Sequence, residues 1–181
     1  MVPGRRGRRA RGVCPPAVCA PRLDGGPLRT VGGYADVLDA LARTRPGCGV
    51  ALAAGAGDRE AAVEAWRAHG RRAHAALAAA TTARYDGVLV AQCERGDRTD
   101  SGAPLGTVAR LLAQYRSPEP VVLAVADGRA AAHTPTDTDV GRATATAADT
   151  VGGTAAGTRR AARVRFRADT TEFAVAFREA L

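Results

Sequence analysis

The sequence predicts an α/β fold: an open sheet of two or three layers, with at least three mostly parallel strands and covering helices. Three apolar runs of strand length, 50–54, 88–93 and 121–126, carry this prediction. An alanine-rich helical pattern joins the first run to the second, and a shorter one joins the second to the third. Parallel neighbours need a crossover connection, usually a helix, so this alternation predicts two β-α-β units.

The remaining elements follow from spacing and turn residues. A first helix is expected before Pro46, because apolar residues recur at helical steps there: Tyr34, Val37, Leu38 and Leu41. Asp58 is expected to cap the long second helix, and Pro104 to open the third. Near the end, arginines alternate with Val164 and Phe166, as in a strand with one buried face. A capping box from Asp169 then predicts a final helix.

These elements suggest a division of the 181 residues. Residues 1–21 are expected to be a disordered basic and proline-rich arm, and 22–132 the α/β core. The segment 133–158 is rich in threonine, alanine and glycine and shows no clean period, so it is expected to be a loop or linker. Residues 159–181 would supply the terminal strand and helix.

Charge is unevenly distributed along the chain. All 26 basic residues are arginine, and lysine, isoleucine and asparagine are absent, which indicates a GC-rich genome. The formal net charge is +8, and removing the five arginines of the first twelve residues leaves +3. Nucleic acid is therefore expected as a partner only through this arm, by contacts to phosphates. No run approaches a membrane span and no signal sequence is recognised, so a cytoplasmic protein without membrane contact is expected.

Candidate ligand-binding residues follow the three apolar runs. In an open parallel sheet, ligands bind beyond the carboxyl ends of the strands. The residues there suit a phosphate or a nucleotide, although the spacing departs from the dinucleotide fingerprint. They are Gly55, Gly57, Asp58, Glu94, Asp127 and Arg129.

Cysteine and histidine do not predict a metal site or a catalytic residue. Cys14 and Cys19 form a C-x4-C pair rather than the C-x2-C spacing of zinc sites, and the three histidines are scattered. Cys93 follows a strand, with His69 upstream, but its turn differs from that of cysteine proteases. It is interpreted as a small buried hydrophobic residue. No cofactor is predicted, and whether the chain is an enzyme stays open.

One broader resemblance concerns residues 35–132. The succession RPGCGVALAAGAGD, ARYDGVLVAQCE and SPEPVVLAVADGRAAA resembles the strand order in the first half of a ketosynthase or thiolase-like domain. That family's nucleophilic cysteine has no counterpart between Asp58 and Tyr85. The resemblance therefore implies a shortened, non-condensing accessory protein of fatty-acid or polyketide synthesis that acts as a homo- or heterodimer. Two alternatives remain: a small α/β domain that binds phosphate or nucleotides, and a nucleic-acid binder that uses its basic arm.

Overall fold

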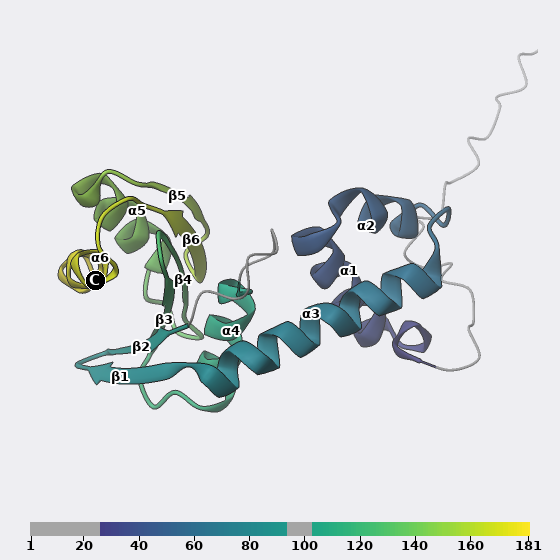
Figure 1. Cartoon of the computed structure of the whole chain (residues 1–181), viewed down its shortest axis with the longest axis horizontal. Coiled ribbons are helices and arrows are strands. Elements are labelled where there is room, and N and C mark those ends of the chain that lie inside the picture. The colour runs from purple at the N-terminus through teal and green to yellow at the C-terminus, as the bar shows by residue number, and fades with distance from the viewer. Residues whose placement is uncertain (1–25, 94–102) are drawn as a thin grey trace, which may run out of the picture. The chain divides into compact units, whose positions relative to one another are not determined.

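A computed structural model describes residues 26–93 and 103–181. The chain divides into two units, Met1–Arg67 and Ala68–Leu181, and the long helix α3 (Arg59–Ala79) runs through the boundary. The described part of the first unit is helical, whereas the second unit contains a six-stranded sheet with helices (Figure 1). The basic arm, residues 1–21, lies outside the described residues.

Short helices build the N-terminal unit. A 3-10 turn η2 (Pro27–Arg29) precedes α1 (Val31–Thr44), α2 (Pro46–Ala53) and the first part of α3. The side chain of Thr30 caps α1 by accepting a hydrogen bond from the Gly33 N–H (3.0 Å). Their apolar sides enclose a small core of Leu28, Val37, Leu41, Leu52, Ala62 and Ala65.

The expected strand at 50–54 is wrong, because residues 46–53 form helix α2. Pro46 occupies the first turn, where its missing N–H costs nothing, and alanine and leucine are strong helix formers. A short apolar run does not distinguish a buried strand from a buried helix by its period. The first predicted β-α-β unit therefore does not exist.

The C-terminal unit is built on a mixed sheet in the order β1-β2-β3-β4-β6-β5. Its strands are β1 (Thr81–Tyr85), β2 (Val88–Gln92), β3 (Val121–Ala126), β4 (Arg129–His133), β5 (Thr154–Gly157) and β6 (Ala161–Arg165). Strands β2 and β3 are parallel and joined through α4 (Leu105–Tyr115), which confirms the second predicted crossover. The other four pairs are antiparallel, so the α/β class is confirmed and the mostly parallel sheet is wrong.

Two Asp-Gly turns produce two of the four antiparallel strand pairs. Tyr85 pairs with Val88 and Ala126 pairs with Arg129, which leaves a two-residue loop in each hairpin. Each loop ends in a glycine with positive φ, 79° at Gly87 and 68° at Gly128. Asp-Gly between apolar runs is a strong hairpin signal, and here it reverses the chain twice.

The tract expected to be a loop at 133–158 is instead helix α5 (Val140–Val151) followed by β5. The buried face of α5 is mostly alanine and includes one threonine, so the sequence shows no clear apolar period. The buried residues are Val140, Ala143, Thr144, Ala147 and Ala148. Gly152 then ends the helix in the left-handed region (φ 72°). The tract thus supplies part of the core.

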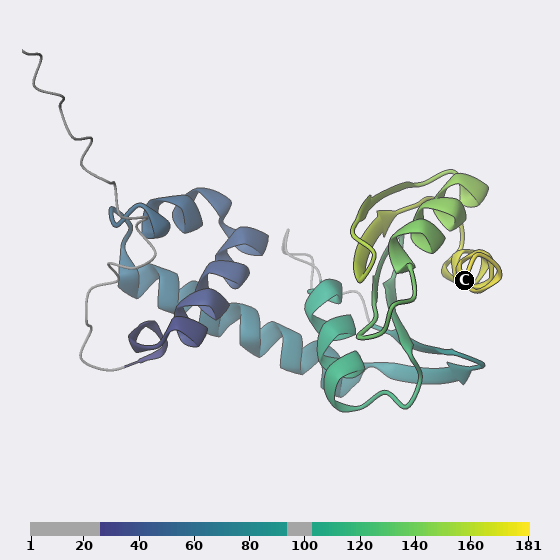
Figure 2. The same ribbon diagram turned by 180° about the vertical axis from the view of Figure 1, so that it is seen from behind.

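Helices cover the two faces of the sheet unequally. Helices α5 and α6 (Thr170–Glu179) lie on one side and α4 lies on the other (Figure 2). The first side holds the three phenylalanines of the chain, Phe166, Phe173 and Phe177, with Phe166 and Phe173 stacked at 4.4 Å between ring centroids. On the second side α4 packs mainly on β3 and β4, and its buried residues Val108, Ala109 and Leu112 belong to the apolar cluster there. None of the helices within the described residues combines the length and apolarity that a membrane span requires.

Candidate functional site

Strand β6 places arginines on the sheet face that α4 covers only in part. Along the strand Ala162 and Val164 are buried, whereas Arg163 and Arg165 are exposed. Successive side chains of a strand point to opposite faces, so both arginines point away from the phenylalanine side. Arg167, two residues further on, is exposed as well.

The neighbouring strand adds a third arginine to this face. Arg165 lies directly opposite Arg129 of β4, and Arg163 lies opposite Ala131. Residues directly opposite in an antiparallel pair share a face, with their Cβ atoms about 4.5–5.5 Å apart. Arg129, Arg163 and Arg165 therefore form one cluster, here called the basic strand face.

The side chains around the basic strand face are short and leave it uncovered. Ala131 is buried under α4, but the cross-strand positions on β5, Thr154 and Ala156, are small and exposed. Helix α4 packs mainly on β3 and β4, so the described residues leave the β6–β5 part of this face open. The three guanidinium groups thus lie on an open surface beside α4.

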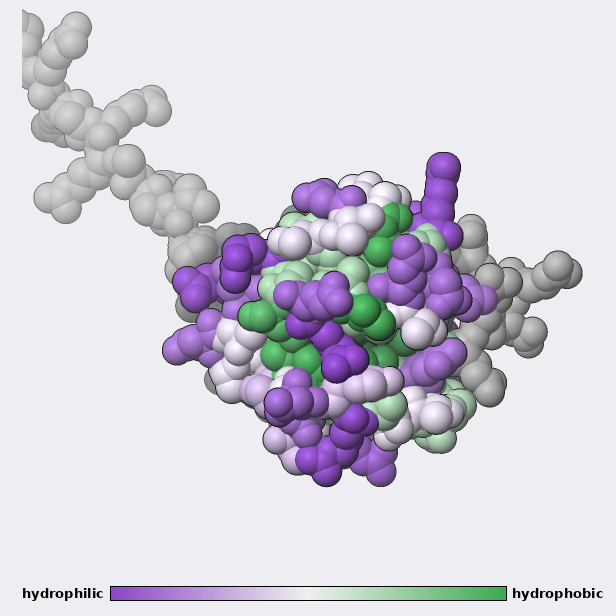
Figure 3. Space-filling model, turned by 90° about the vertical axis from the view of Figure 1, so that its left-hand side faces the viewer, coloured by the Kyte–Doolittle hydropathy of each residue, from purple (hydrophilic) through white to green (hydrophobic). Residues whose placement is uncertain are grey.

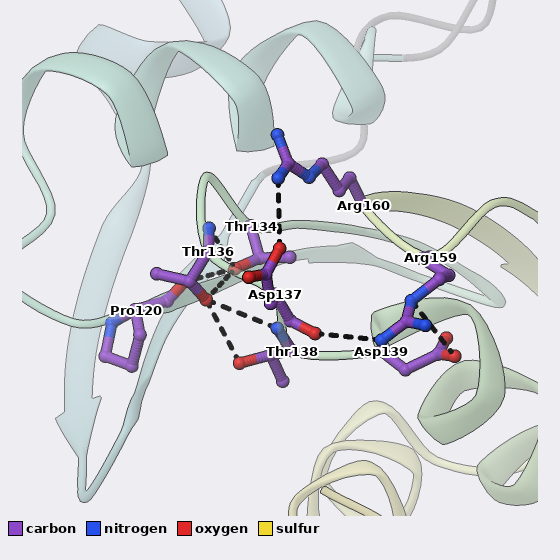
Figure 4. A network of polar contacts seen from close by, with 8 residues as sticks. All are labelled: Pro120, Thr134, Thr136, Asp137, Thr138, Asp139, Arg159 and Arg160. Atoms are coloured by element: carbon purple, nitrogen blue, oxygen red, sulfur yellow. Dashed lines mark hydrogen bonds and ion pairs between the residues drawn. The ribbon is translucent and has the colours of Figure 1, made fainter.

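No ion pair within the described residues neutralises the basic strand face. The two arginines just before β6 behave differently (Figure 4). Arg160 donates to Asp137 Oδ1 (3.1 Å), and Arg159 lies 3.8 Å from Asp139 Oδ2. The turn before β6 is therefore balanced in charge, whereas the strand itself is not.

A chain of threonine hydroxyls orders the connection from β4 to α5, which contains Asp137 (Figure 4). Thr134 Oγ1 donates to the Pro120 carbonyl (2.7 Å) and lies 2.8 Å from Thr136 Oγ1, which in turn lies 3.1 Å from Thr138 Oγ1. The connection from β4 to α5 is thereby tied to the start of β3. A site on rigid strands holds its geometry better than one on loops.

Backbone contacts attach this connection to β6. The N–H groups of Thr134 and Val140 donate to the carbonyls of Arg160 and Arg159, each at 3.0 Å. Gly141 packs so closely that a Cβ there would lie 2.5 Å from the Thr158 carbonyl oxygen. Both ends of the connection from β4 to α5 therefore hold the start of β6.

The residues predicted to bind a ligand belong to different units of the chain. Gly55, Gly57 and Asp58 lie in the α2–α3 connection, and Glu94 lies outside the described residues. Asp58 accepts a hydrogen bond from the Ala61 N–H (3.1 Å), as expected for a cap. Gly57 permits close packing, since a Cβ there would lie 2.6 Å from Leu52 N.

Asp127 belongs to the β3–β4 turn and Arg129 begins β4. The two groups share no sheet edge, because the Gly55 segment follows a helix rather than a strand. A ligand at these residues stays a prediction. The alternating arginines of 163–167 were the signal for the basic strand face in the sequence, where they predicted a strand but not a site.

Cys93 and His69 are buried and contribute to the packing of the fold. Cys93 is 3% exposed, and burial raises the pKa of its thiol, which confirms its interpretation as a small buried residue. His69 is also buried, and its Nε2 lies 2.9 Å from Thr107 Oγ1, which links α3 to α4. Within residues 26–93 and 103–181, no group of three or more His, Cys, Asp and Glu side chains could hold a metal ion.

Sequence comparison matches the C-terminal unit to a known family. Residues 80–179 match the family described as "Uncharacterized protein rrnAC1427, C-terminal domain". The uncharacterized protein rrnAC1427 of Haloarcula marismortui is 56% identical over 158 residues, which is 87% of this chain and 41% of that protein. The chain thus spans about two fifths of the length of this relative.

Structure comparison finds the fold among DHH-domain proteins. A DHH-domain protein described as a member of the S1p family of ribosomal proteins has a TM-score of 0.52 and 14% identity, over 84% of this chain and 42% of its own. RecJ from Thermus thermophilus, solved in complex with Mg2+, has a TM-score of 0.53 and 17% identity, over 84% of this chain and 24% of its own. At such identities the likeness concerns the fold.

These findings correct the resemblance to ketosynthases and thiolases. The structural neighbours are DHH-domain proteins, and the family is a different one. The assignment to fatty-acid or polyketide synthesis is therefore wrong. Its physical basis was a succession of three parallel strands, and the first of them is helix α2.

Proposed function

We propose that the C-terminal unit of this chain binds nucleic acid through the basic strand face. The chain belongs to the family described as "Uncharacterized protein rrnAC1427, C-terminal domain", whose match covers that unit. The DHH-domain neighbours favour a function related to nucleic acid, and one of them is described as a member of a family of ribosomal proteins. The proposal concerns this unit and does not extend to the full length of the relative.

One observation carries the proposal: two arginines lie directly opposite each other without an acid between them. Like charges at such positions destabilise a sheet, so the Arg129–Arg165 pair is costly in the free protein. A phosphate held between the two guanidinium groups would remove this repulsion. Arginine suits that task, because its planar fork donates two parallel hydrogen bonds to phosphate oxygens.

The make-up of the face also indicates how it binds. Sequence is recognised through groups that reach base edges, and bases of single strands stack on aromatic rings. The described residues beside the arginines on this face are mostly small: Ala131, Thr154, Ala156 and Ala161, with His133 opposite Ala161 at the end of β4. The face therefore supports contacts to the phosphate backbone with little preference for sequence.

The salt dependence of binding tests the proposal. Fluorescence anisotropy with labelled oligonucleotides, single-stranded and duplex, gives the slope of log K against log salt concentration. Each phosphate contact contributes about 0.7 to that slope for single strands and about 0.9 for duplex DNA. We expect Arg165→Ala to weaken binding and to reduce the slope by about one contact.

Arg142→Ala is the matched control. It removes the same charge from α5, which covers the other side of the sheet. A second series, in which the five arginines of residues 1–12 are replaced by alanine, separates the arm from the strand face. Equal slopes for Arg165→Ala and Arg142→Ala in that series would refute the proposal.

A further inference from the structure

Strand β1 is an open edge of the sheet. All five of its residues are exposed, although β2 beside it is almost entirely buried. It lies at the outer end of the strand order, and among the described residues its neighbour in the sheet is β2 (Figure 1). We infer that β1 is a dimerisation edge, which pairs antiparallel with β1 of a second copy of this chain.

The hydrogen-bond pattern decides which backbone groups of β1 are available. The Cys93 N–H donates to the Val125 carbonyl (2.8 Å) and the Gly87 carbonyl accepts from the Val121 N–H (3.3 Å), so the odd-numbered residues of β2 face β3. The even-numbered residues, Val88 and Val90 among them, then bond to β1, where their partners are Tyr85 and Ala83. The groups that point away from the sheet belong to Thr82 and Arg84.

The outward backbone groups of β1 can pair with the same groups of a second β1 strand. A two-fold axis through Ala83 places Thr82 opposite the partner's Arg84 and Arg84 opposite the partner's Thr82, so that the free N–H and C=O groups of both strands meet. The two alanines then face each other as the closely spaced pair that lies between such hydrogen-bonded pairs. No side chain at the centre obstructs the approach.

The edge also lacks the features that protect edge strands. Natural sheets block their edges with proline, bulges or free charges. Strand β1 contains no proline and pairs with β2 over five consecutive residues without a bulge. Its single charged side chain, Arg84, is occupied by Glu119 at 2.8 Å and 3.1 Å.

Exposed apolar surface lies at the same end of the unit. The side that carries α6 and the tip of the β1–β2 hairpin shows hydrophobic side chains among hydrophilic ones (Figure 3). Tyr85 of β1 is 41% exposed, and the guanidinium of Arg178 lies 4.2 Å from its ring centroid. In the symmetric pair Tyr85 lies opposite the partner's Thr81, an aromatic and β-branched pair that stabilises sheets.

Such a dimer would present two basic strand faces together. The two-fold axis stands perpendicular to the sheet, so both faces lie on the same side. Nine strand spacings separate the two β6 strands in the resulting order, roughly 43 Å at about 4.8 Å each. The dimer does not depend on nucleic-acid binding, and oligomeric state tests it separately.

The experiment measures the mass of the full chain in solution by analytical ultracentrifugation over a range of concentrations, without nucleic acid. We expect a monomer–dimer equilibrium. Ala83→Lys places two like charges at the axis and should give a monomer, and Ala83→Glu should do the same. An equimolar mixture of the two variants should restore a heterodimer, because opposite charges then meet at the centre.

Ala145→Lys, the same change on the exposed surface of α5, is the control and should leave the dimer intact. Circular dichroism of each variant establishes that it is folded. A monomer at every concentration, a dimer that persists in Ala83→Lys, or a mixture that stays monomeric would each overturn the inference.

Discussion

Phe173→Ala is expected to be the most damaging single truncation in the C-terminal unit. Phe173 is fully buried and lies between the two other phenylalanines, with ring centroids 4.4 Å from Phe166 and 6.3 Å from Phe177. Removing a buried phenylalanine side chain costs about 3–5 kcal/mol. The surrounding side chains are mostly alanine and valine, which reach poorly into the resulting cavity.

That loss is large against the total stability of about 5–15 kcal/mol of a typical domain. Urea denaturation followed by far-ultraviolet circular dichroism measures it, and the melting temperature should fall by about 6–20 °C. Val175→Ala, a truncation on the exposed side of the same helix, should change stability by about 0.5 kcal/mol or less. If both variants lost the same amount, the three rings would not be the centre of this core.

Three further predictions concern turns, caps and thiols. Gly128→Ala should destabilise the protein more than Gly87→Ala in urea denaturation, because both glycines have positive φ but a Cβ at Gly128 would also lie 3.1 Å from a backbone oxygen. The Thr171 N–H holds the pKa of Asp169 below its ordinary value, so the carboxylate stabilises the fold above the unfolded pKa. This contribution is lost as the pH falls through the lowered pKa, and the stability difference from Asp169→Ala, measured across acid pH, should shrink there. Burial and a raised pKa should make Cys93 react with a thiol reagent far more slowly in the native protein than in urea; equal rates would contradict its burial.

The helices with strong periodicity could be predicted from the sequence. Helices α1, α3, α4 and α6 all lie where spacing and caps place them, and β3 occupies the expected residues 121–126. Local chemistry decides these elements, because an amphipathic period or a capping side chain acts within a few residues. The same holds for Asp58, which caps α3 as expected.

Other elements depend on the tertiary structure and could not be assigned in that way. The run at 50–54 is apolar and short, so its packing rather than its period decides between helix and strand. Helix α5 buries Thr144 by letting its hydroxyl donate to the Val140 carbonyl (2.6 Å), and a sequence pattern that counts threonine as polar misses it. The two hairpins were missed although Asp86-Gly87 and Asp127-Gly128 indicate them.

The candidate site shows the same limit. Arg163 and Arg165 belong to a strand that was predicted, but they form a cluster only because Arg129 lies beside them on the neighbouring strand. Register between strands distant in sequence is set by the whole fold. The clustering of three arginines on one face therefore becomes visible in the structure.

The interleaving of core and surface along β6 has a consequence for how this unit varies among relatives. Arg163 and Arg165 each stand between two buried residues, so exchanges at 163 and 165 leave the interior untouched and can change the charge of the surface at little structural cost. An inserted or deleted residue has the opposite effect, since it would turn guanidinium groups toward the phenylalanine rings and Val164 toward water. Substitutions should accumulate in this strand during divergence, whereas changes of its length should be purged.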